Sequence, residues 1–437
     1  MGIGRTPAWV IRPAHTGMPP APESPGATIE LLQQAGIALC DSGAPTLRIT
    51  ERLYRLAIAY GIDDVRLFVL PTGVFVGSPG YATAFRRAEG HTLNLDQNAA
   101  LHELFDVAAA GRCTAADCLR RLHKILRAPS RYGVGTTIFG HALLGVGLGL
   151  IITPTVPALG AYAVLSALVG AGSLMIQRTP RFAATFPVVA AFLVTLVANR
   201  IAGPWLGETP IMALVPPLAW LLPAAKLTTG ALDLSWGDTI SGAARLLDAG
   251  NRIMLLAFGA LAATQLLPPA STIATYPHLT WGPWAAPAVF AVGMALVMSA
   301  PIRVLPHMTA ICYSAYGAMV AGGILFDPLL SGFFGGLVAT VASMVAQRLP
   351  KGPPAAAGFL AAFWLLVPGR LGLSEVIETG ITHQLSSLTA GGDALLTVVA
   401  IATGVLVAAG PARIGRDPHR GSSRPRADPG IECRRHE

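Results

Sequence analysis

Charged side chains are scarce in most of this chain. Asp, Glu, Lys and Arg together make up 12% of the 437 residues, about half of their share in a typical soluble domain. From Gly133 to Ala409 the sequence consists of apolar blocks separated by short breaks with Pro, Gly or Arg. Many blocks are about 18–22 residues long, the length at which a helix crosses the hydrocarbon core of a bilayer. The missing charge excludes a wholly soluble protein and predicts a polytopic α-helical membrane protein.

Cysteine is also scarce, and its pattern argues against a disulfide framework. The five cysteines are scattered and odd in number, which favours a reducing compartment. The His and Cys residues between positions 91 and 123 match no zinc-ligand spacing, so we expect neither a metal nor a cofactor. No basic stripe with interleaved aromatic residues accompanies the net charge of +8, so we expect no nucleic-acid partner.

The first part of the chain has the mixed composition of a soluble domain. Residues 28–132 predict a small α+β domain of order ααββαα, with strands at 65–70 and 73–77 and a polar connector at 81–95. Residues 1–27 are rich in Pro and Gly and lack the apolar core of a cleavable signal peptide. We expect them to be a disordered tail.

About ten membrane-spanning helices are expected after this domain, in two halves of five. The halves cover residues 133–270 and 271–410, and a disordered basic tail of residues 411–437 follows. Lys and Arg are concentrated on one side of the spans, which places the soluble domain and both termini in the cytoplasm. The expected spans lie at about 134–153, 158–177, 182–201, 210–230, 251–269, 285–302, 307–326, 329–347, 354–372 and 392–410.

An internal similarity supports the division into halves. At an offset of 145 residues, Leu222-Pro223-Ala224 aligns with Val367-Pro368-Gly369, and Asp248 aligns with Asp393. Two halves with an odd number of spans have opposite orientations, which is the inverted-repeat arrangement of many secondary transporters. A rival match of Ser173–Pro180 with Ser343–Pro350 has a different offset, and we give the longer match more weight.

Several short motifs resemble one known family. They are Val215-Pro216-Pro217-Leu218-Ala219-Trp220-Leu221-Leu222-Pro223, Gly230-Ala231-Leu232-Asp233-Leu234, Gly237-Asp238 and Ser241-Gly242-Ala243-Ala244-Arg245-Leu246, with Ser42-Gly43-Ala44 and Ala59-Tyr60-Gly61 nearer the N-terminus. The pattern resembles the bacterial threonine/serine exporter family over about residues 28–410. Ala224 and Lys226 depart from it, since smaller or apolar residues are expected after the proline.

The resemblance implies a secondary transporter rather than an enzyme. Such a protein exports threonine, serine or similar small amino acids across the bacterial inner membrane, driven by the proton motive force. Its partners are then the amino acids, protons and the lipid bilayer. Whether the protein forms a homo-oligomer is left open by the sequence. The alternative function is a membrane-anchored sensor or regulator whose soluble domain binds a small molecule. A membrane-embedded enzyme is disfavoured, because the expected spans hold no set of catalytic groups at one depth.

Ionisable residues near the ends of spans are the candidates for substrate binding and proton coupling. Asp233 and Asp238 are candidates to bind the substrate ammonium or carry a proton. Arg245 is a candidate to pair with either of them or to hold a carboxylate. Lys226 belongs to the same segment, which is alternatively an ordinary solvated loop.

Helix breaks and one histidine complete the candidates. Breaks that present backbone dipoles to a substrate are expected at Pro223 and Gly230 in the first half, and at Pro368 and Gly369 in the second. His141 lies deep in the first expected span, where a lone histidine is either a packing residue or a member of a proton relay.

Overall fold

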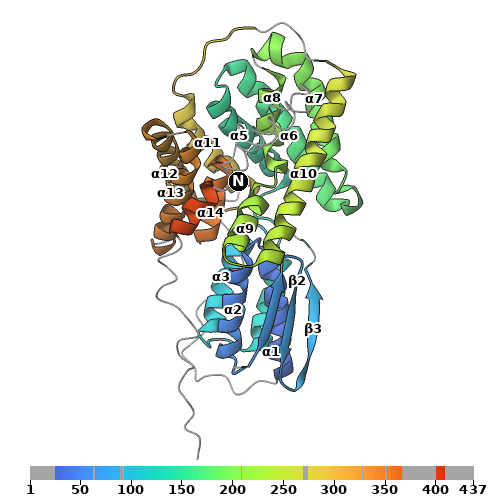
Figure 1. Cartoon of the computed structure of the whole chain (residues 1–437), viewed down its shortest axis with the longest axis vertical. Coiled ribbons are helices and arrows are strands. Elements are labelled where there is room, and N and C mark those ends of the chain that lie inside the picture. The colour runs from blue at the N-terminus through green and yellow to red at the C-terminus, as the bar shows by residue number, and fades with distance from the viewer. Residues whose placement is uncertain are drawn as a thin grey trace, which may run out of the picture.

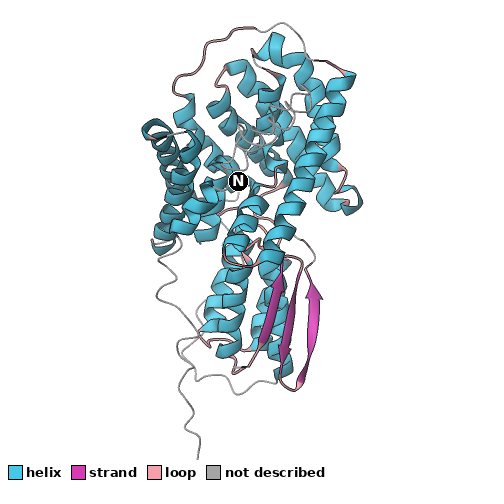
Figure 2. Cartoon of the chain, viewed as in Figure 1, coloured by secondary structure: helices cyan, strands magenta, loops and turns pink. Residues whose placement is uncertain are grey.

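Two regions of different architecture follow one another along the chain (Figure 1). This computed structural model describes residues 25–62, 64–88, 90, 93–207, 209–268, 274–326, 328–349, 352–353, 355–366 and 400–408. The first region, up to Leu126, combines helices with one sheet, and the described part of the second is built from helices (Figure 2). The expectations for residues 1–24, for Pro368 and Gly369 and for the C-terminal tail lie outside the described residues.

Four helices form most of the first region, namely α1 (Pro25–Asp41), α2 (Thr46–Ala59), α3 (Leu95–Ala109) and α4 (Ala115–Leu126). Polar side chains fix where two of them begin. Asn94 and Gln97 form a capping box at the start of α3, and the Thr114 hydroxyl accepts a hydrogen bond from the amide of Asp117 at the start of α4. The helices enclose a buried apolar core that extends from Ile29 to Ile125.

Three antiparallel strands form the sheet of this region, in the order β1-β2-β3. They are β1 (Arg66–Leu70), β2 (Gly73–Ser78) and β3 (Tyr81–Arg87). The predicted order ααββαα is therefore wrong by one strand, since β3 occupies part of the predicted polar connector. The described side chains of β3 are all half-buried or exposed. This edge strand therefore lacks the apolar alternation by which a strand is recognised in a sequence.

The second region contains six helices that are long and apolar enough to cross a membrane, counted among the described residues. The chain is therefore a polytopic helical membrane protein, while the number of ten spans and the inverted repeat stay predictions. Residues 400–408 are also helical. The helices of this region are α5 (Val134–Ile152), α6 (Val156–Arg178), α7 (Phe186–Ile201), α8 (Pro210–Leu218), α9 (Ala224–Ser235), α10 (Thr239–Leu266), α11 (Gly282–Val297), α12 (Leu305–Leu325), α13 (Pro328–Arg348) and α14 (Ala355–Leu366).

The expected fourth span differs most from the structure. Residues 210–230 do not form one helix but α8, a short 3-10 turn η3 (Ala219–Leu221) and the beginning of α9. The stretch between the expected spans at 210–230 and 251–269 is mostly helical, in the end of α9 and the first half of α10. Apolar composition alone did not reveal these breaks, because proline interrupts the helix without lowering the hydrophobicity of the segment.

Helices from the two expected halves pack closely against each other. α11 lies along α5, and glycines bring the two backbones together. A Cβ added at Gly293 would lie 2.8 Å from the amide nitrogen of Leu144, and one added at Gly147 would lie 2.9 Å from that of Phe290. Small residues at such a crossing are typical of helix pairs in membranes.

The two regions meet where α9 and α10 reach down to the helices of the first region (Figure 1). Backbone atoms also join them: the amide of Leu95 donates to the carbonyl of Met298 at 2.8 Å. The Tyr132 hydroxyl donates to the carbonyl of Ala300 at 2.9 Å. The start of α3 is thereby fixed against the end of α11.

Candidate functional site

A broken helix lies in the middle of the second region. α8 contains Pro216 and Pro217, which have no amide hydrogen to donate to the carbonyls of Met212 and Ala213. After η3 the chain leaves helical geometry at Leu222 and starts again in α9 at Ala224. Pro223 therefore lies at a helix break, as the sequence predicts. Carbonyls that lose their helical partner are tolerated inside a membrane only where protein or a water-filled cavity surrounds them.

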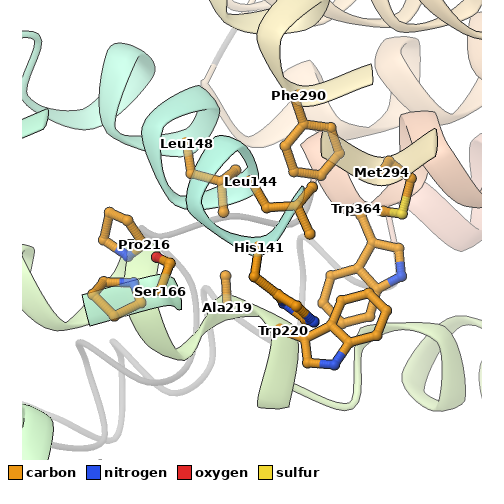
Figure 3. Close-up of a pocket in the computed structure, with 11 residues that line it drawn as sticks. His141, Leu144, Leu148, Ser166, Pro216, Ala219, Trp220, Phe290, Met294 and Trp364 are labelled. Atoms are coloured by element: carbon orange, nitrogen blue, oxygen red, sulfur yellow. The ribbon is translucent and has the colours of Figure 1, made fainter. Parts of the chain in front are cut away.

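Beside this break lies a small hollow between the helices (Figure 3). Its volume open to the centres of water molecules is about 10 Å³, which is room for roughly one water. Figure 3 shows His141 and two tryptophan rings on one side and Ser166 and Pro216 on the other. The lining residues come from α5, α6, α8, η3, α11 and α14 and are His141, Leu144, Leu148, Ser166, Pro216, Pro217, Ala219, Trp220, Phe290, Met294 and Trp364.

Aromatic rings form one wall of the hollow. The ring of His141 meets that of Trp220 edge to face, with centroids 5.1 Å apart. Trp220 in turn stacks on Trp364 with centroids 5.7 Å apart and an angle of 21° between the planes. The faces of tryptophan rings attract cations, so this wall suits a positively charged group.

Two polar side chains lie at the hollow with little exposure to solvent. His141 is 3% exposed and Ser166 is 4% exposed. The Ser166 hydroxyl is buried and has no hydrogen-bond partner, an arrangement that is rare in folded proteins and calls for an explanation. A hydroxyl that faces a hollow is available to a ligand that enters it.

Glycines hold these two side chains in place. A Cβ added at Gly170 would lie 2.4 Å from the ring of His141, and one added at Gly145 would lie 1.9 Å from the Ser166 oxygen. Both distances are shorter than van der Waals contact. The positions of His141 and Ser166 therefore depend on the absence of a side chain opposite each of them.

A second cluster, of charged groups, lies where α9 and α10 meet the first region. Asp233 is fully buried and Arg245 is 8% exposed, and Arg245 Nε lies 3.0 Å from Asp233 Oδ2. Thr46, the first residue of α2, donates to the same carboxylate from its amide at 2.9 Å and from its hydroxyl at 3.1 Å. Arg245 also donates to the carbonyl of Ala44 at 2.9 Å and, from its other terminal nitrogen, to the Thr229 hydroxyl at 3.5 Å.

Burial dominates the electrostatics of this cluster. Removal from water raises the pKa of the Asp233 carboxyl, while the Arg245 guanidinium and the two hydrogen bonds from Thr46 act in the opposite direction. Asp238 follows in the turn before α10, and partial burial raises its pKa as well. Asp233 and Arg245 are thus brought together by the fold, as the sequence analysis considered, but their partners include the first region of the chain.

The other predicted residues of this segment lie apart from the hollow. Lys226 forms an ion pair with Asp248 in which both side chains are about half exposed. Gly230 does not break a helix, since it lies inside the continuous α9 and packs against Leu246 of α10. None of Lys226, Asp233, Asp238 and Arg245 lines the hollow, whereas His141 does. No group of three possible metal ligands occurs among the described residues.

Ser166, Trp220 and Trp364 are lining residues that the sequence analysis did not single out. Trp220 lies in the Val215–Pro223 motif, but nothing in a single sequence shows that it meets His141. Ser166 looks like one of many small residues in an apolar helix, and only the packing reveals its unpaired hydroxyl. These lining residues could be recognised only from contacts between helices that lie far apart in the sequence.

A polytopic helical bundle with a broken helix and a small hollow beside it has features that many secondary transporters share. The comparison with protein families agrees. Residues 30–267 match the family model ThrE, described as "Putative threonine/serine exporter". The match covers more than half of the 437 residues, and the chain belongs to the ThrE family. It spans the first region and the helices up to α10, whereas α11 to α14 lie beyond it.

Neither the curated proteins nor the solved structures that were compared match this chain. The family match and the geometry of the site therefore carry the functional argument.

Proposed function

We propose that this protein exports threonine, serine or a similar small amino acid, and that the hollow beside His141 is its substrate site. The proposal rests on which helices supply the residues that line the hollow. α5, α6 and α8 come from the first expected half, and α11 and α14 come from the second. Substrate sites of secondary transporters lie at such an interface, next to discontinuous helices.

The chemistry of the lining suits a small hydroxy amino acid. The rings of Trp220 and Trp364 cover one face of each other by stacking, and the remaining face of either ring is a candidate to hold the substrate ammonium group. The unpaired Ser166 hydroxyl and the His141 ring are partners for the substrate hydroxyl or carboxylate.

The size of the hollow fits a closed state of the transport cycle. A volume of about 10 Å³ holds a water molecule but no amino acid. Binding of substrate then requires the helices of the two halves to separate. The breaks around η3 are the natural points of movement, since few helical hydrogen bonds cross them.

Coupling to the proton motive force requires groups that gain and lose a proton during the cycle. Asp233 and Asp238 have carboxyls whose pKa is raised by burial, which brings protonation closer to the pH of the cell. His141 lies in the hollow itself and is the third candidate. We propose that one or more of these groups carries the exchanged proton, with Arg245 as the counter-charge of Asp233.

The proposed setting is the bacterial inner membrane, with the soluble region and both termini in the cytoplasm. The Lys and Arg bias of the loops supports this orientation. It places the contact between the soluble region and α9–α10 on the side from which an exporter takes its substrate.

The experiment that tests the function is efflux of radiolabelled threonine and serine from preloaded cells that express the chain. Efflux above the vector control, with loss of most of it on addition of a protonophore, is the expected result. Alanine and lysine, loaded in the same way, test the preference for a small hydroxy amino acid. Absence of efflux for every substrate, with the protein shown to be in the membrane, contradicts the proposal.

A further inference from the structure

Three segments that lie far apart in the sequence meet at the junction of the two regions. Ala44 and Thr46 lie just before and at the start of α2, Asp233 lies near the end of α9, and Arg245 lies in the second turn of α10. The contacts of Asp233 with Thr46 join residues 187 positions apart, and the contact of Arg245 with Ala44 spans 201 positions. We call these four residues the junction clamp.

The clamp is buried, and its centre is an ion pair between α9 and α10, Asp233 with Arg245, each of which also binds the first region. Asp233 is 0% exposed and Arg245 is 8% exposed. The carboxylate lies at the N-terminal end of α2, where free amides and the helix dipole favour a negative charge. Removal of one partner leaves the other as an unpaired buried charge, which is strongly unfavourable. Hydrogen bonds from Thr46 to Asp233 and from Arg245 to Ala44 attach this pair to the first region.

Helix α9 connects the clamp to the substrate hollow. α9 begins at Ala224, directly after η3 with Trp220 and the break at Pro223. α9 and α10 are packed tightly, since a Cβ at Gly242 would lie 2.8 Å from the carbonyl oxygen of Gly230. α9 also contacts α14, so a shift of the α9–α10 pair reaches Trp364 of α14 and the Trp220 ring stacked on it.

From these contacts we propose that Thr46 is a positioning residue of the transporter: through the junction clamp, the soluble region sets the position of the α9–α10 pair and of Trp220. The soluble region is then a working part of the transport unit rather than a separate module. The part of the proposal that concerns the contact between the two regions rests on the observed contacts alone. The part that concerns transport rests on the proposed function.

Two substitutions of Thr46 in the full-length chain test the clamp from the soluble side, without altering either charge. Thr46→Val removes the hydroxyl donor. Thr46→Pro removes both donors, and proline is compatible with the first position of a helix. The preceding Pro45 already has the extended backbone (φ −61°, ψ 143°) that a residue before proline prefers. Thr50→Val is the matched control, because its hydroxyl bonds inside α2, to the carbonyl of Thr46.

The first measurement is amide hydrogen exchange of the purified full-length protein. The expected result is exchange in α9 (Ala224–Ser235) that is about ten-fold faster in Thr46→Pro, with a smaller increase in Thr46→Val and no change in Thr50→Val. Exchange in α3 checks that the soluble region stays folded. Unchanged exchange in α9 of Thr46→Pro, with α3 intact, overturns the clamp, whether or not the protein transports threonine.

The second measurement is threonine efflux by the same variants. Efflux that falls in the order wild type, Thr46→Val, Thr46→Pro, with Thr50→Val at the wild-type rate, supports the positioning role. Wild-type efflux in Thr46→Pro, with faster exchange in α9, overturns it. If the wild type itself shows no efflux, the proposed function has failed, and the exchange experiment alone decides whether the clamp couples the regions.

Discussion

At the scale of single residues, close packing rather than charge defines the hollow. Gly170 and Gly145 make room for His141 and Ser166, and an added Cβ at either position would overlap its neighbour. Interiors of this density do not absorb an extra methyl group without moving side chains or backbone. The glycines are therefore as much a part of the site as the residues that line it.

Gly170→Ala is expected to displace His141 and to destabilise the protein by about 1–3 kcal/mol, with loss of transport. Gly160 lies on the same helix α6 with nothing within 4 Å of an added Cβ, so Gly160→Ala is the matched control. Thermal unfolding in detergent and threonine efflux measure the two effects. Equal behaviour of the two variants contradicts the account of the site.

A second residue-scale prediction concerns pH. Burial, together with the Arg52 guanidinium, lowers the pKa of His102 to about 4, below its ordinary value of about 6.5. The unfolded chain therefore binds a proton at a higher pH than the folded one. The free energy of unfolding falls as pH decreases from about 6.5 to 4, by about 2–3 kcal/mol. His102→Gln removes this pH dependence in thermal melts, and exposed His123→Gln retains it.

At the scale of elements, the sequence predicted helices well where the apolar blocks are uninterrupted. The observed α5, α6, α12 and α13 agree with the expected spans to within a few residues. The expectation of one continuous span at 210–230 was wrong, because the chain leaves helical geometry between η3 and α9 although the segment is apolar throughout. The edge strand β3 was not predicted, because its described side chains are half-buried or exposed and its sequence therefore lacks a clear alternation of apolar and polar residues. For the site, His141 was among the candidates, but its tryptophan and serine neighbours depend on packing between helices.

The proline pair in α8 provides the element-scale prediction. Pro217→Ala restores a helical hydrogen bond to the carbonyl of Ala213 and stiffens the segment beside the hollow. We expect a protein of equal or higher thermal stability whose efflux falls several-fold. Pro157→Ala is the control, because Pro157 lies in the first turn of α6, where proline removes no helical bond. Wild-type efflux in Pro217→Ala contradicts the proposal that the chain moves at this break during transport.

At the scale of the whole molecule, the sequence predicts an α+β region followed by apolar helices, and the structure has that order, but the sequence does not indicate how the two regions meet. The partners of Asp233 and Arg245 lie about two hundred residues away in the chain. The local motifs identify these charged residues as candidate functional residues but do not indicate which residues they contact. The junction clamp became visible only once both regions were seen together.

The orientation in the membrane is the whole-molecule prediction. Arg87 on β3 and Thr280 before α11 are both exposed, and they lie on opposite sides of the membrane in the proposed topology. A cysteine at position 280 is expected to react with an impermeant thiol reagent in intact cells. A cysteine at position 87 is expected to react only after the cells are opened. The reverse pattern overturns the topology and the direction of transport.

The central claim is that the hollow beside His141 binds the transported amino acid, and substitution of Trp220 tests it most directly. Threonine exchange is measured with the purified protein in liposomes, for the wild type, Trp220→Leu and Trp205→Leu, a control at a tryptophan that is 69% exposed. The account predicts that Trp220→Leu weakens the apparent affinity for threonine about ten-fold or more, while Trp205→Leu leaves it unchanged. Wild-type affinity in Trp220→Leu contradicts it.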